Sequence, residues 1–566
     1  MDEAYLEVNC LEDVCHAPIE TIITLFIIKY CASKVRIRFI RCGKKADERS
    51  YTIDVSSFSY TLSEMSDVPS YARFCYLPNI IVNKTSCVAG LCAILRQIIK
   101  SSIAEQPAHY CHTLLGFKYS SLLACSESSV WTKFCEVDMI STMKTLNQEE
   151  TDKSELPVNL ARFECHMSHQ PRMHNFYKYT MSKKFAPGGI TTQDRSIIPQ
   201  YDYANGNSVT LADMIILVCV HIIFNLIKDK KVLKILPLTV KWYEKVIQDN
   251  VILKCLICLP EQGGSKFIGT NYSLPVVDNQ SLVRRRYKSR NRIFTKQEVV
   301  DSTLEHIKKF RVNTKLNEEP FGADVTIDWN KIPQEATPVG GGLPIARLKR
   351  KFEQLENLCQ PVIKLAVSGN VIVDFCSGSG HLGILVAYML PECTVILLEN
   401  KEESLNRAKE RVAKLQLKNV YFYQCNLDYF KGQFDIGMSL HACGVATDLV
   451  IQHCMRINAV FVSCPCCYGA IQICHHITYP RSDLFKKLIN TTDYLAISHA
   501  ADQTHEASNA KTKQGYACMA VIDADRRLLA EEFGYTVHVS KLIPESCTPK
   551  NHLLVGIPGN RVMTGS

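Results

Sequence analysis

Residues suited to chemistry gather first around a glycine-rich turn in the C-terminal half of the chain. The apolar stretch 371–375 carries Asp374 near its end and is followed by Gly378 and Gly380. Glycines permit a tight turn and a close approach of the backbone to a ligand, because they have no Cβ atom. The next apolar stretch ends at Glu399, whose carboxylate can accept hydrogen bonds from two hydroxyl groups at once. This spacing predicts a nucleotide-type ligand; the alternative for Glu399 is an acid that favours the start of the following helix.

Two later segments carry histidine, cysteine and tyrosine at the ends of predicted strands. The first, HACG, includes His441, and the second, CPCCYG, includes Tyr468. Histidine transfers protons at neutral pH because its unperturbed pKa is about 6.5. We therefore expect His441 to act as a general base or to orient an acceptor, with Tyr468 as a second catalytic residue at the same edge. The alternative for His441 is only a hydrogen bond across the sheet edge.

The same segments concentrate soft metal ligands. Zinc prefers thiolate and imidazole ligands, so a zinc site is one option there. However, CPCC lacks the paired C-x-x-C spacing of a structural zinc site, and reduced cysteine is a common small apolar residue. We therefore predict no metal site among these residues, which are Cys443, Cys464, Cys466, Cys467, Cys474, His475 and His476.

A regular alternation of strands and helices must position these residues. From residue 343 to about 560, apolar strand patterns alternate with helical ones, which is typical of a parallel sheet covered by helices on both faces. Ligands of such doubly wound α/β folds bind at the carboxyl ends of the strands. We expect the glycine turn, Glu399, His441 and Asp428, which follows a third strand, at this edge.

The D-x-x-x-G-x-G spacing, with an acid at the end of the next strand, resembles class I S-adenosylmethionine-dependent methyltransferases. The resemblance implies a Rossmann-like fold, methyl transfer as the reaction and S-adenosyl-L-methionine as the cofactor. In that family the glycine turn passes the methionyl part, the strand-end acid accepts the ribose hydroxyls, and a third acid lies near the adenine. The segments HACGVATD and CPCCYG narrow the resemblance to a branch that includes a tRNA ribose 2′-O-methyltransferase family. The implied cofactor-binding residues are Asp374, Gly378, Gly380, Glu399 and Asp428.

The N-terminal half has a different pattern. Thr210 and Asp213 form a capping pattern ahead of a long apolar helix. The helical pattern breaks near Pro237, and Trp242 lies in the next helix. Together with the upstream segment LPNIIV, these residues resemble glutathione transferases.

This second resemblance implies a mostly helical module. Departures from the family pattern indicate that the module has no glutathione transferase activity. It places a degenerate thioredoxin-like part at 1–75 and a helical domain at 76–255, with a long loop at about 147–207 where periodicity is lost. In the family, an acid and a serine bind the γ-glutamyl group of glutathione. Here Thr85 replaces the acid before Ser86, and no clear catalytic Tyr, Ser or Cys follows the first strand. We therefore expect a folded, non-catalytic module.

A basic connector is expected at 256–342, where turn residues are frequent. Its basic run contains no acid and would attract phosphate groups through counterion release; the alternative is a solvated linker. Arg347, Arg350 and Lys351 form a second basic face at the start of the next domain. These segments make RNA the preferred partner and acceptor, with protein as the alternative. The run consists of Arg284, Arg285, Arg286, Lys288, Arg290, Arg292 and Lys296.

Composition narrows the class of protein only in part. At 566 residues, two or three domains are expected. A net charge of +9, from 65 basic and 56 acidic residues, is too small to indicate nucleic acid by itself. The apolar run 214–227 is too short to span a membrane, and 26 scattered cysteines without a secretory leader favour a reduced, cytoplasmic protein.

The sequence as a whole predicts an α/β protein, with a doubly wound Rossmann-like methyltransferase sheet at 343–560 preceded by a mostly helical glutathione-transferase-like module. In this order of parts it resembles the glutathione S-transferase C-terminal domain-containing family. The predicted function is methyl transfer from S-adenosylmethionine to RNA or protein. The alternative is a scaffold without enzymatic activity, whose helical half binds a protein partner.

Overall fold

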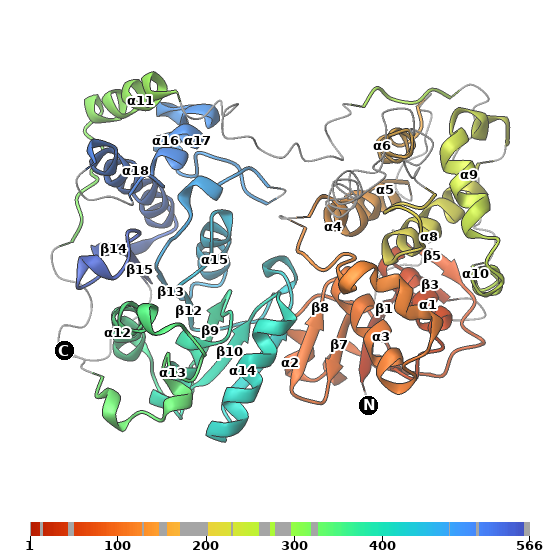
Figure 1. Ribbon diagram of the computed structural model, residues 1–566, viewed down its shortest axis with the longest axis horizontal. Helices are drawn as coiled ribbons and strands as arrows, with labels where there is room; N and C mark the ends of the chain where they lie inside the picture. Colours follow the sequence, from red (N-terminus) through yellow and green to blue (C-terminus); the bar gives the residue numbers. More distant parts are fainter. Residues whose placement is uncertain are drawn as a thin grey trace, which may run out of the picture. The chain divides into compact units, whose positions relative to one another are not determined.

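The structure, a computed structural model, contains two compact units, residues 1–286 and 287–566. Each unit has its own strands and helices (Figure 1). The boundary between them lies within the connector that the sequence predicts. No helix among the described residues is both long enough and apolar enough to cross a bilayer. The described residues are 2–11, 15–42, 50–126, 129–146, 155–169, 202–227, 230–259, 272–277, 296–317, 327–474, 476–504 and 509–559.

The first unit begins with strands in the order β8-β7-β1-β4-β6. β1, β4 and β6 run parallel, whereas β7 is antiparallel to both β1 and β8. Helices α1 and α3 pack against each other and share a buried core with these strands. The sheet extends past the predicted boundary at residue 75, so this part of the module is α/β and not mostly helical. Its elements are β1 (Glu3–Val8), α1 (Ile19–Tyr30), β4 (Arg36–Arg41), β6 (Tyr60–Glu64), β7 (Asn79–Val82), β8 (Ser86–Ala89) and α3 (Leu91–Glu105).

A helical region follows, with the buried helix α8 at its centre. The predicted cap is present: one carboxylate oxygen of Asp213 accepts hydrogen bonds from the amide and the hydroxyl of Thr210, each at 2.8 Å. The other oxygen accepts the indole N–H of Trp242 at 2.9 Å, so Asp213 also fixes the next helix. Burial raises the pKa of Asp213, and these hydrogen bonds oppose the rise. The helices are α4 (Val130–Lys133), α5 (Met139–Leu146), α6 (Val158–Met167), α8 (Leu211–Leu226), α9 (Pro237–Val246) and α10 (Asn250–Leu256).

Helix α6 lies inside the segment 147–207, which the sequence predicts to be a long loop. Leu160 and Phe163 of α6 are buried, and Phe163 packs edge-on against Trp242 with ring centroids 4.9 Å apart. The helix is short and has polar, turn-rich neighbours, so its period is weak in the sequence. The remaining parts of the predicted loop, 147–154 and 170–201, lie outside the described residues.

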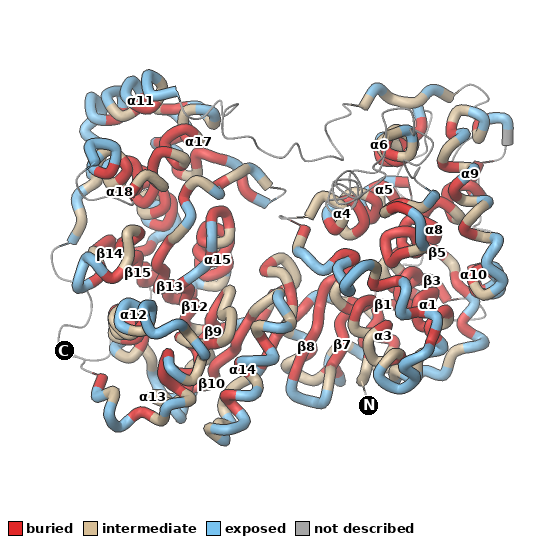
Figure 2. Tube along the Cα trace, viewed as in Figure 1, coloured by how far each residue is buried: buried red, intermediate tan, exposed pale blue. Residues whose placement is uncertain are grey.

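The second unit contains the predicted doubly wound sheet, in the order β14-β15-β13-β12-β9-β10-β11. β9 to β13 run parallel, and β15 and β14 are antiparallel to their neighbours. The order of strands reverses at β9, which is where ligands bind in open α/β sheets. The central strands are largely buried (Figure 2). The strands are β9 (Val371–Phe375), β10 (Thr394–Leu398), β11 (Val420–Gln424), β12 (Ile436–Ser439), β13 (Val460–Ser463), β14 (Tyr535–Lys541) and β15 (His552–Pro558).

Helices cover both faces of this sheet, because alternate residues of a strand point to opposite sides. Ile372 of β9 shares a core with residues of α12, α13 and α14. Phe375 of the same strand stacks on His453 of α15, with ring centroids 5.9 Å apart. Helix α18 packs against β14 and β15. The helices are α12 (Ile345–Leu365), α13 (His381–Met389), α14 (Glu402–Leu415), α15 (Val445–Arg456) and α18 (Ala510–Glu532).

The predicted connector contributes folded elements to the second unit. Helix α11 (Gln297–Lys309) packs against α17 (Thr491–Ala500). It buries Val300 and Ile307, which lie seven residues apart on one face of the helix. Only part of 256–342 is therefore a connector. The narrow apolar face of α11 is difficult to recognise in the sequence because the surrounding residues are highly charged.

A buried group of charges joins α18 to the loops at the carboxyl edge of the sheet. Arg526 of α18 is 2% exposed and donates two hydrogen bonds to Asp448 of α15 and one to Asp523, each at 2.9 Å. Asp523 also accepts the hydroxyl of Tyr468 at 2.7 Å and lies 2.7 Å from Nδ1 of His552. Burial favours a higher pKa for Asp523, but the hydrogen bond with His552 and the charge of Arg526 outweigh it and lower the pKa.

We expect Arg526→Met to destabilise the second unit by about 3–5 kcal/mol, because two buried carboxylates would lose their cation. Urea unfolding followed by circular dichroism measures the effect, and hydrogen exchange assigns it to the second unit. Arg527→Met is the matched control, since the ion pair of Arg527 with Glu531 is longer, at 3.6 Å, and the side chain of Glu531 is 41% exposed. Equal losses in the two variants would contradict a dominant role of the buried cation.

Candidate functional site

A cavity opens at the carboxyl ends of β9 and β12, where the strand order reverses. Its volume is about 560 Å³, within the range of small-molecule sites. The wall consists of the first turns of α12, the glycine turn after β9, the loop after β12 and residues 547–549. The structure brings Asp374, Gly378 and His441 together in this wall, as the sequence predicts.

The two predicted glycines of the turn have different roles. Gly378 has a φ of +56° and Gly380 a φ of +74°, both in the left-handed region. A Cβ atom on Gly380 would lie 3.0 Å from the side chains of Ile384 and Leu397, so this glycine allows α13 to pack against the sheet. A Cβ atom on Gly378 would meet nothing within 4 Å. Gly378 therefore borders open space, through which a ligand can reach the backbone.

Glu399 lies at the end of β10, beside the glycine turn. One carboxylate oxygen accepts the amide N–H of Gly378 at 2.8 Å, and the other accepts that of Lys401 at 2.8 Å. Lys401 precedes α14, so Glu399 braces the glycine turn and supports the helix start at the same time. Each carboxylate oxygen has a further lone pair, so Glu399 can still accept hydroxyl groups.

Asp374 is a buried residue of β9, only 3% exposed. Its Oδ2 accepts the amide N–H of Gly383 in α13 at 2.9 Å. Burial raises the pKa of Asp374 to about 7, although this hydrogen bond and the charge of Lys351 oppose the rise. The contact with Gly383 makes Asp374 a positioning residue for α13, in addition to its place in the cavity wall.

His441 and Lys351 form a hydrogen-bonded pair in the cavity wall. Nζ of Lys351 lies 2.7 Å from Nε2 of His441. Surrounding protein and the charge of Lys351 lower the pKa of His441 to about 4, and burial lowers the pKa of Lys351 to about 8. At neutral pH the lysine therefore carries the charge and donates to a neutral imidazole. The sequence identifies both residues but not their contact, because they lie on elements far apart in the chain.

Four predicted site residues do not line the cavity: Gly380 and Glu399, which lie in and beside the glycine turn, and Asp428 and Tyr468. Asp428 follows β11, and its Oδ1 lies 3.3 Å from Nε2 of His476. Tyr468 is 1% exposed, and Asp523 accepts its hydroxyl. A buried hydroxyl with this partner does not border an acceptor, so the predicted catalytic role of Tyr468 is replaced by a structural one. The cofactor role of Asp428 stays a prediction.

Arg411 of α14 supports the glycine turn, although it belongs to none of the predicted site motifs. Its guanidinium donates to the carbonyl oxygens of Ser379 and Glu335, each at 2.8 Å, and to that of Thr337 at 3.2 Å. The side chain therefore ties the glycine turn to the segment that precedes α12. The one signal in the sequence is an arginine on the apolar face of its helix.

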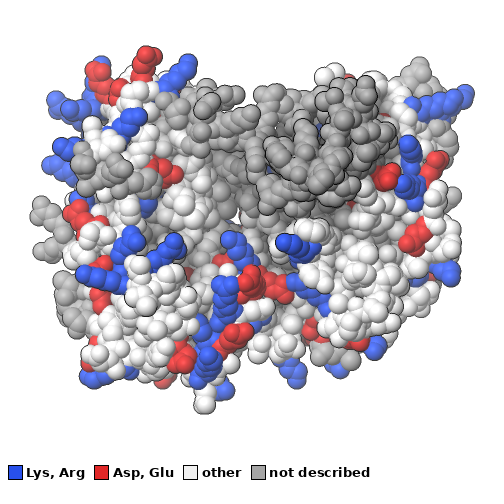
Figure 3. Space-filling model, viewed as in Figure 1, with Lys and Arg blue, Asp and Glu red and all other residues white. Residues whose placement is uncertain are grey.

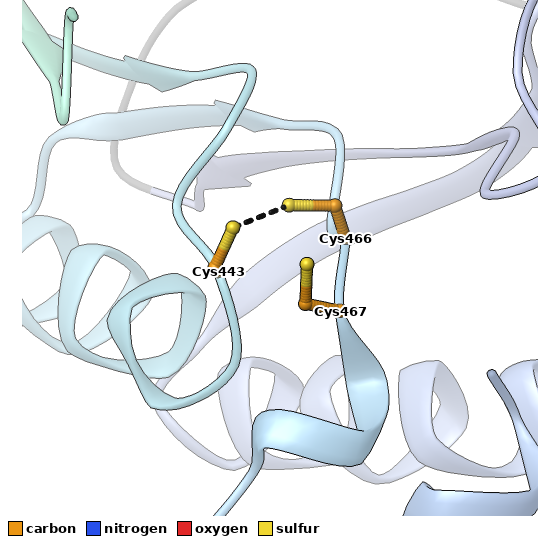
Figure 4. Close-up of side chains that lie close together, drawn as sticks. All are labelled: Cys443, Cys466 and Cys467. Carbon is orange, nitrogen blue, oxygen red and sulfur yellow. Dashed lines mark hydrogen bonds between the residues drawn. The ribbon is translucent and has the colours of Figure 1, made fainter. Parts of the chain in front are cut away.

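Three cysteines meet at the carboxyl edge of the sheet (Figure 4). Cys443 follows β12, whereas Cys466 and Cys467 follow β13, and the three sulfur atoms lie within 4.8 Å of one another. The Sγ atoms of Cys443 and Cys466 are 3.2 Å apart. Hydrogen bonds from the other two thiols lower the pKa of Cys467 to about 3. Cys464 is not part of this cluster, because its buried thiol faces a backbone carbonyl at 3.5 Å.

This three-cysteine cluster removes the main sequence argument against a metal site. A C-x-x-C pair is unnecessary when the third thiol comes from a different loop. Among the described residues, Cys474 and His476 lie outside the cluster. His475, also weighed as a ligand, lies outside the described residues.

Positive charge is concentrated locally at the cavity. On the face shown in Figure 3, basic and acidic side chains of the described residues are interspersed. The cavity wall instead contains Arg347, Arg350 and Lys351, and the acid that faces them there is the buried Asp374. This distribution favours anionic groups in the cavity.

A profile of the methyltransferase domain family matches residues 349–474. Similar solved structures include the tRNA (uracil-54, C5)-methyltransferase of Pyrococcus abyssi in complex with S-adenosyl-L-homocysteine. It is 17% identical and covers 36% of this chain and 37% of that chain, with a TM-score of 0.21. The magnesium protoporphyrin IX methyltransferase of Synechocystis with bound SAM is 13% identical and covers 38% and 86%, with a TM-score of 0.24. TM-scores this low carry no argument about function.

Relatives over the full length define the family. A glutathione S-transferase C-terminal domain-containing protein homologue of Drosophila pseudoobscura pseudoobscura is 39% identical over 98% of this chain and 99% of its own. The glutathione S-transferase C-terminal domain-containing protein of Homo sapiens is 31% identical over 98% of both chains. With this identity over nearly its whole length, the chain belongs to the family of glutathione S-transferase C-terminal domain-containing proteins.

Proposed function

We propose that this protein is an S-adenosylmethionine-dependent methyltransferase and that the second unit is its catalytic domain. The observation that carries the proposal is the hydrogen bond between Glu399 and Gly378 at the reversal of strand order. It holds a hydroxyl acceptor beside a backbone segment with open space in front of it. A nucleoside with an amino-acid extension needs both features. The methyltransferase-domain match over 349–474 supports the same function.

The cavity wall fits this cofactor chemically. Glu399, which holds Gly378 of the wall, would accept the ribose hydroxyls. The charge of Lys351 suits the carboxylate of the methionyl part. The hydroxyl of Ser377 and Nδ1 of His381 are buried and have no hydrogen-bond partner among the described residues, so they are available to a ligand that rearranges the wall. When bound, S-adenosylmethionine supplies an electrophilic methyl group.

His441 would orient the acceptor of the methyl group. Its place in the cavity wall, on the loop after β12, supports this role. Lys351 holds Nε2 of the ring, so Nδ1 is the nitrogen that remains for an acceptor. Because Nε2 accepts from Lys351, Nδ1 carries the proton of the neutral ring, so His441 would position the acceptor by donating a hydrogen bond to it.

RNA is the acceptor class that the charges favour. Arg347 and Arg350 would meet phosphate groups around the cavity. In the predicted basic run, Arg284 to Arg292 lie outside the described residues, and Lys296 directly precedes α11. A protein acceptor is the alternative.

The first unit would serve as a non-catalytic module. Ser86 starts β8 and is 3% exposed, and the residue before it is Thr85, which has no charge for the γ-glutamyl group of glutathione. The alternative for the whole chain is a scaffold without enzymatic activity. Cofactor binding distinguishes the two functions.

Glu399→Ala is expected to weaken binding of S-adenosylmethionine tenfold or more, since hydrogen bonds to a charged acceptor contribute about 1.5–3 kcal/mol each. Isothermal titration of the full chain measures the affinity. Glu403→Ala is the matched control, because Glu403 lies nearby on α14 and pairs with Arg407 on the surface. Absence of binding to the unmodified protein would exclude the proposed function. Unchanged affinity in folded Glu399→Ala would show that Glu399 supports the start of α14 and does not bind the cofactor.

Asp374→Asn is expected to change the pH dependence of stability. Because the pKa of Asp374 is raised to about 7 in the folded state, the native protein binds more protons than the unfolded chain between about pH 4 and 7. The unmodified protein should therefore lose stability relative to Asp374→Asn as pH rises through this window. Urea midpoints of both proteins measured across it test the prediction. Parallel curves would show that Asp374 ionises normally.

Arg347→Ala with Arg350→Ala should weaken binding of tRNA-sized RNA and shallow its salt dependence, by about 0.7–0.9 in log–log slope per lost phosphate contact. Filter binding at increasing salt gives the slope. Lys349→Ala removes one charge from the same helix turn but does not line the cavity, so it should change the slope less. An unchanged slope in the double variant would favour a protein acceptor.

A further inference from the structure

Two loops at the carboxyl edge of the second unit hold the three-cysteine cluster by backbone contacts. Cys443 and Cys466 are partners in a parallel β-bridge, and the amide N–H of Gly444 donates to the carbonyl oxygen of Cys466 at 3.3 Å. Gly444 has a φ of +60°, and a Cβ atom there would lie 2.5 Å from the carbonyl oxygen of Ala470. A glycine at 444 is therefore needed for the two loops to approach.

The backbone at Cys467 directs two neighbouring thiols toward the third. Consecutive side chains of an extended chain point to opposite sides. Cys467 instead has a φ of +50°, which is uncommon for a residue with a Cβ atom. With this turn, the sulfurs of Cys466 and Cys467 both lie near that of Cys443 (Figure 4). Backbone strain of this kind concentrates at functional sites.

The distances suit a tetrahedral metal ion. Zinc–sulfur bonds are about 2.3 Å long, which places neighbouring sulfurs of a tetrahedral site about 3.8 Å apart. The Sγ atoms of Cys443 and Cys466 are 3.2 Å apart, and all three sulfurs lie within 4.8 Å. Small side-chain rotations therefore suffice to surround an ion. Cys443 and Cys467 are exposed and Cys466 is partly exposed, so the ion has access.

We propose that Cys443, Cys466 and Cys467 bind a zinc ion through three thiolates and leave its fourth coordination position open. Soft thiolates select zinc among the common divalent ions, and zinc requires no redox partner. Structural zinc sites have four protein ligands, whereas sites with three protein ligands keep a position for water or substrate. Among the described residues, no fourth cysteine, histidine or carboxylate joins the cluster.

The three-cysteine cluster lies beside the residue that would orient the acceptor in the proposed methyl transfer. His441, in the cavity wall, is two residues before Cys443 on the same loop. A zinc ion here would bind an acceptor hydroxyl and lower its pKa, so that the hydroxyl is a better nucleophile. This role rests on the proposed function. Binding of the ion rests only on the three thiols.

Metal content of the full chain tests the proposal. Protein purified under reducing conditions without chelator should contain about one zinc ion per chain by mass spectrometry of the elements, lose it to a chelator and regain it from a zinc salt. Cys443→Ser, Cys466→Ser and Cys467→Ser should each reduce this content to background. Cys474→Ser is the matched control, since Cys474 follows on the same segment but lies outside the cluster. It should retain the zinc.

Cobalt(II) gives a second readout that folding alone does not produce. Chelator-treated protein loaded with cobalt should show thiolate-to-cobalt charge transfer and the strong visible bands of a tetrahedral ion, and each serine variant should weaken the charge transfer. Far-ultraviolet circular dichroism verifies that the variants are folded. The proposal is overturned if unmodified protein takes up no metal, if it contains iron or copper in place of zinc, or if a Cys443–Cys466 disulfide persists under reducing conditions.

The two proposals fail separately. Zinc binding without affinity for S-adenosylmethionine would support the metal site and exclude the methyltransferase. Affinity for S-adenosylmethionine without zinc would support the methyltransferase and exclude the metal site. The serine variants should keep their affinity for S-adenosylmethionine within about twofold, because the three thiols do not line the cavity.

Discussion

The geometry of the candidate site depends most on the ion pairs of one buried guanidinium, that of Arg526. It pairs with Asp448 at the start of α15 and with Asp523, which in turn holds the hydroxyl of Tyr468. Asp448 lies directly beyond the loop after β12, and Tyr468 directly beyond the segment after β13. The two loops that carry reactive side chains are therefore fastened to α18 through carboxylates that have no access to water. Burying these charges is costly unless each is paired, so the arrangement tolerates little displacement.

The geometry of the glycine turn depends on hydrogen bonds to its backbone. Glu399 accepts the amide of Gly378, and Arg411 donates to the carbonyl oxygen of Ser379, so the turn is held from both sides. Gly380 lets α13 pack closely, and Gly378 leaves space in front of the turn. The rigid part of the turn and the part open to a ligand are therefore different residues. Such preorganisation lowers the ordering cost of binding.

A buried carboxylate also organises the first unit. Asp213 caps α8, accepts the amide N–H of Ala204 at 2.6 Å and accepts the indole of Trp242 at 2.9 Å. One side chain thus joins a helix start, the preceding segment and the following helix. Asp213 and Asp523 have the same structural role: each carboxylate accepts hydrogen bonds from several buried donors. In the first unit this arrangement stabilises a helical core, whereas in the second it supports loops at the candidate site.

The sequence by itself determined the family, the alternation of strands and helices in the second unit, and the glycine turn with the acid at the end of the next strand. These features are local: a strand period, a glycine turn and the residue at a strand end are legible within a few positions, as Gly378 and Glu399 illustrate. Only the tertiary structure decided that β7 and β8 belong to the first sheet, that Tyr468 is structural and that Lys351 meets His441. It alone assembled the three-cysteine cluster. Each of these features depends on contacts between residues that are distant in the chain. Such contacts determine how deeply a side chain is buried, and burial in turn sets its charge state and its access to solvent, which residue type alone does not.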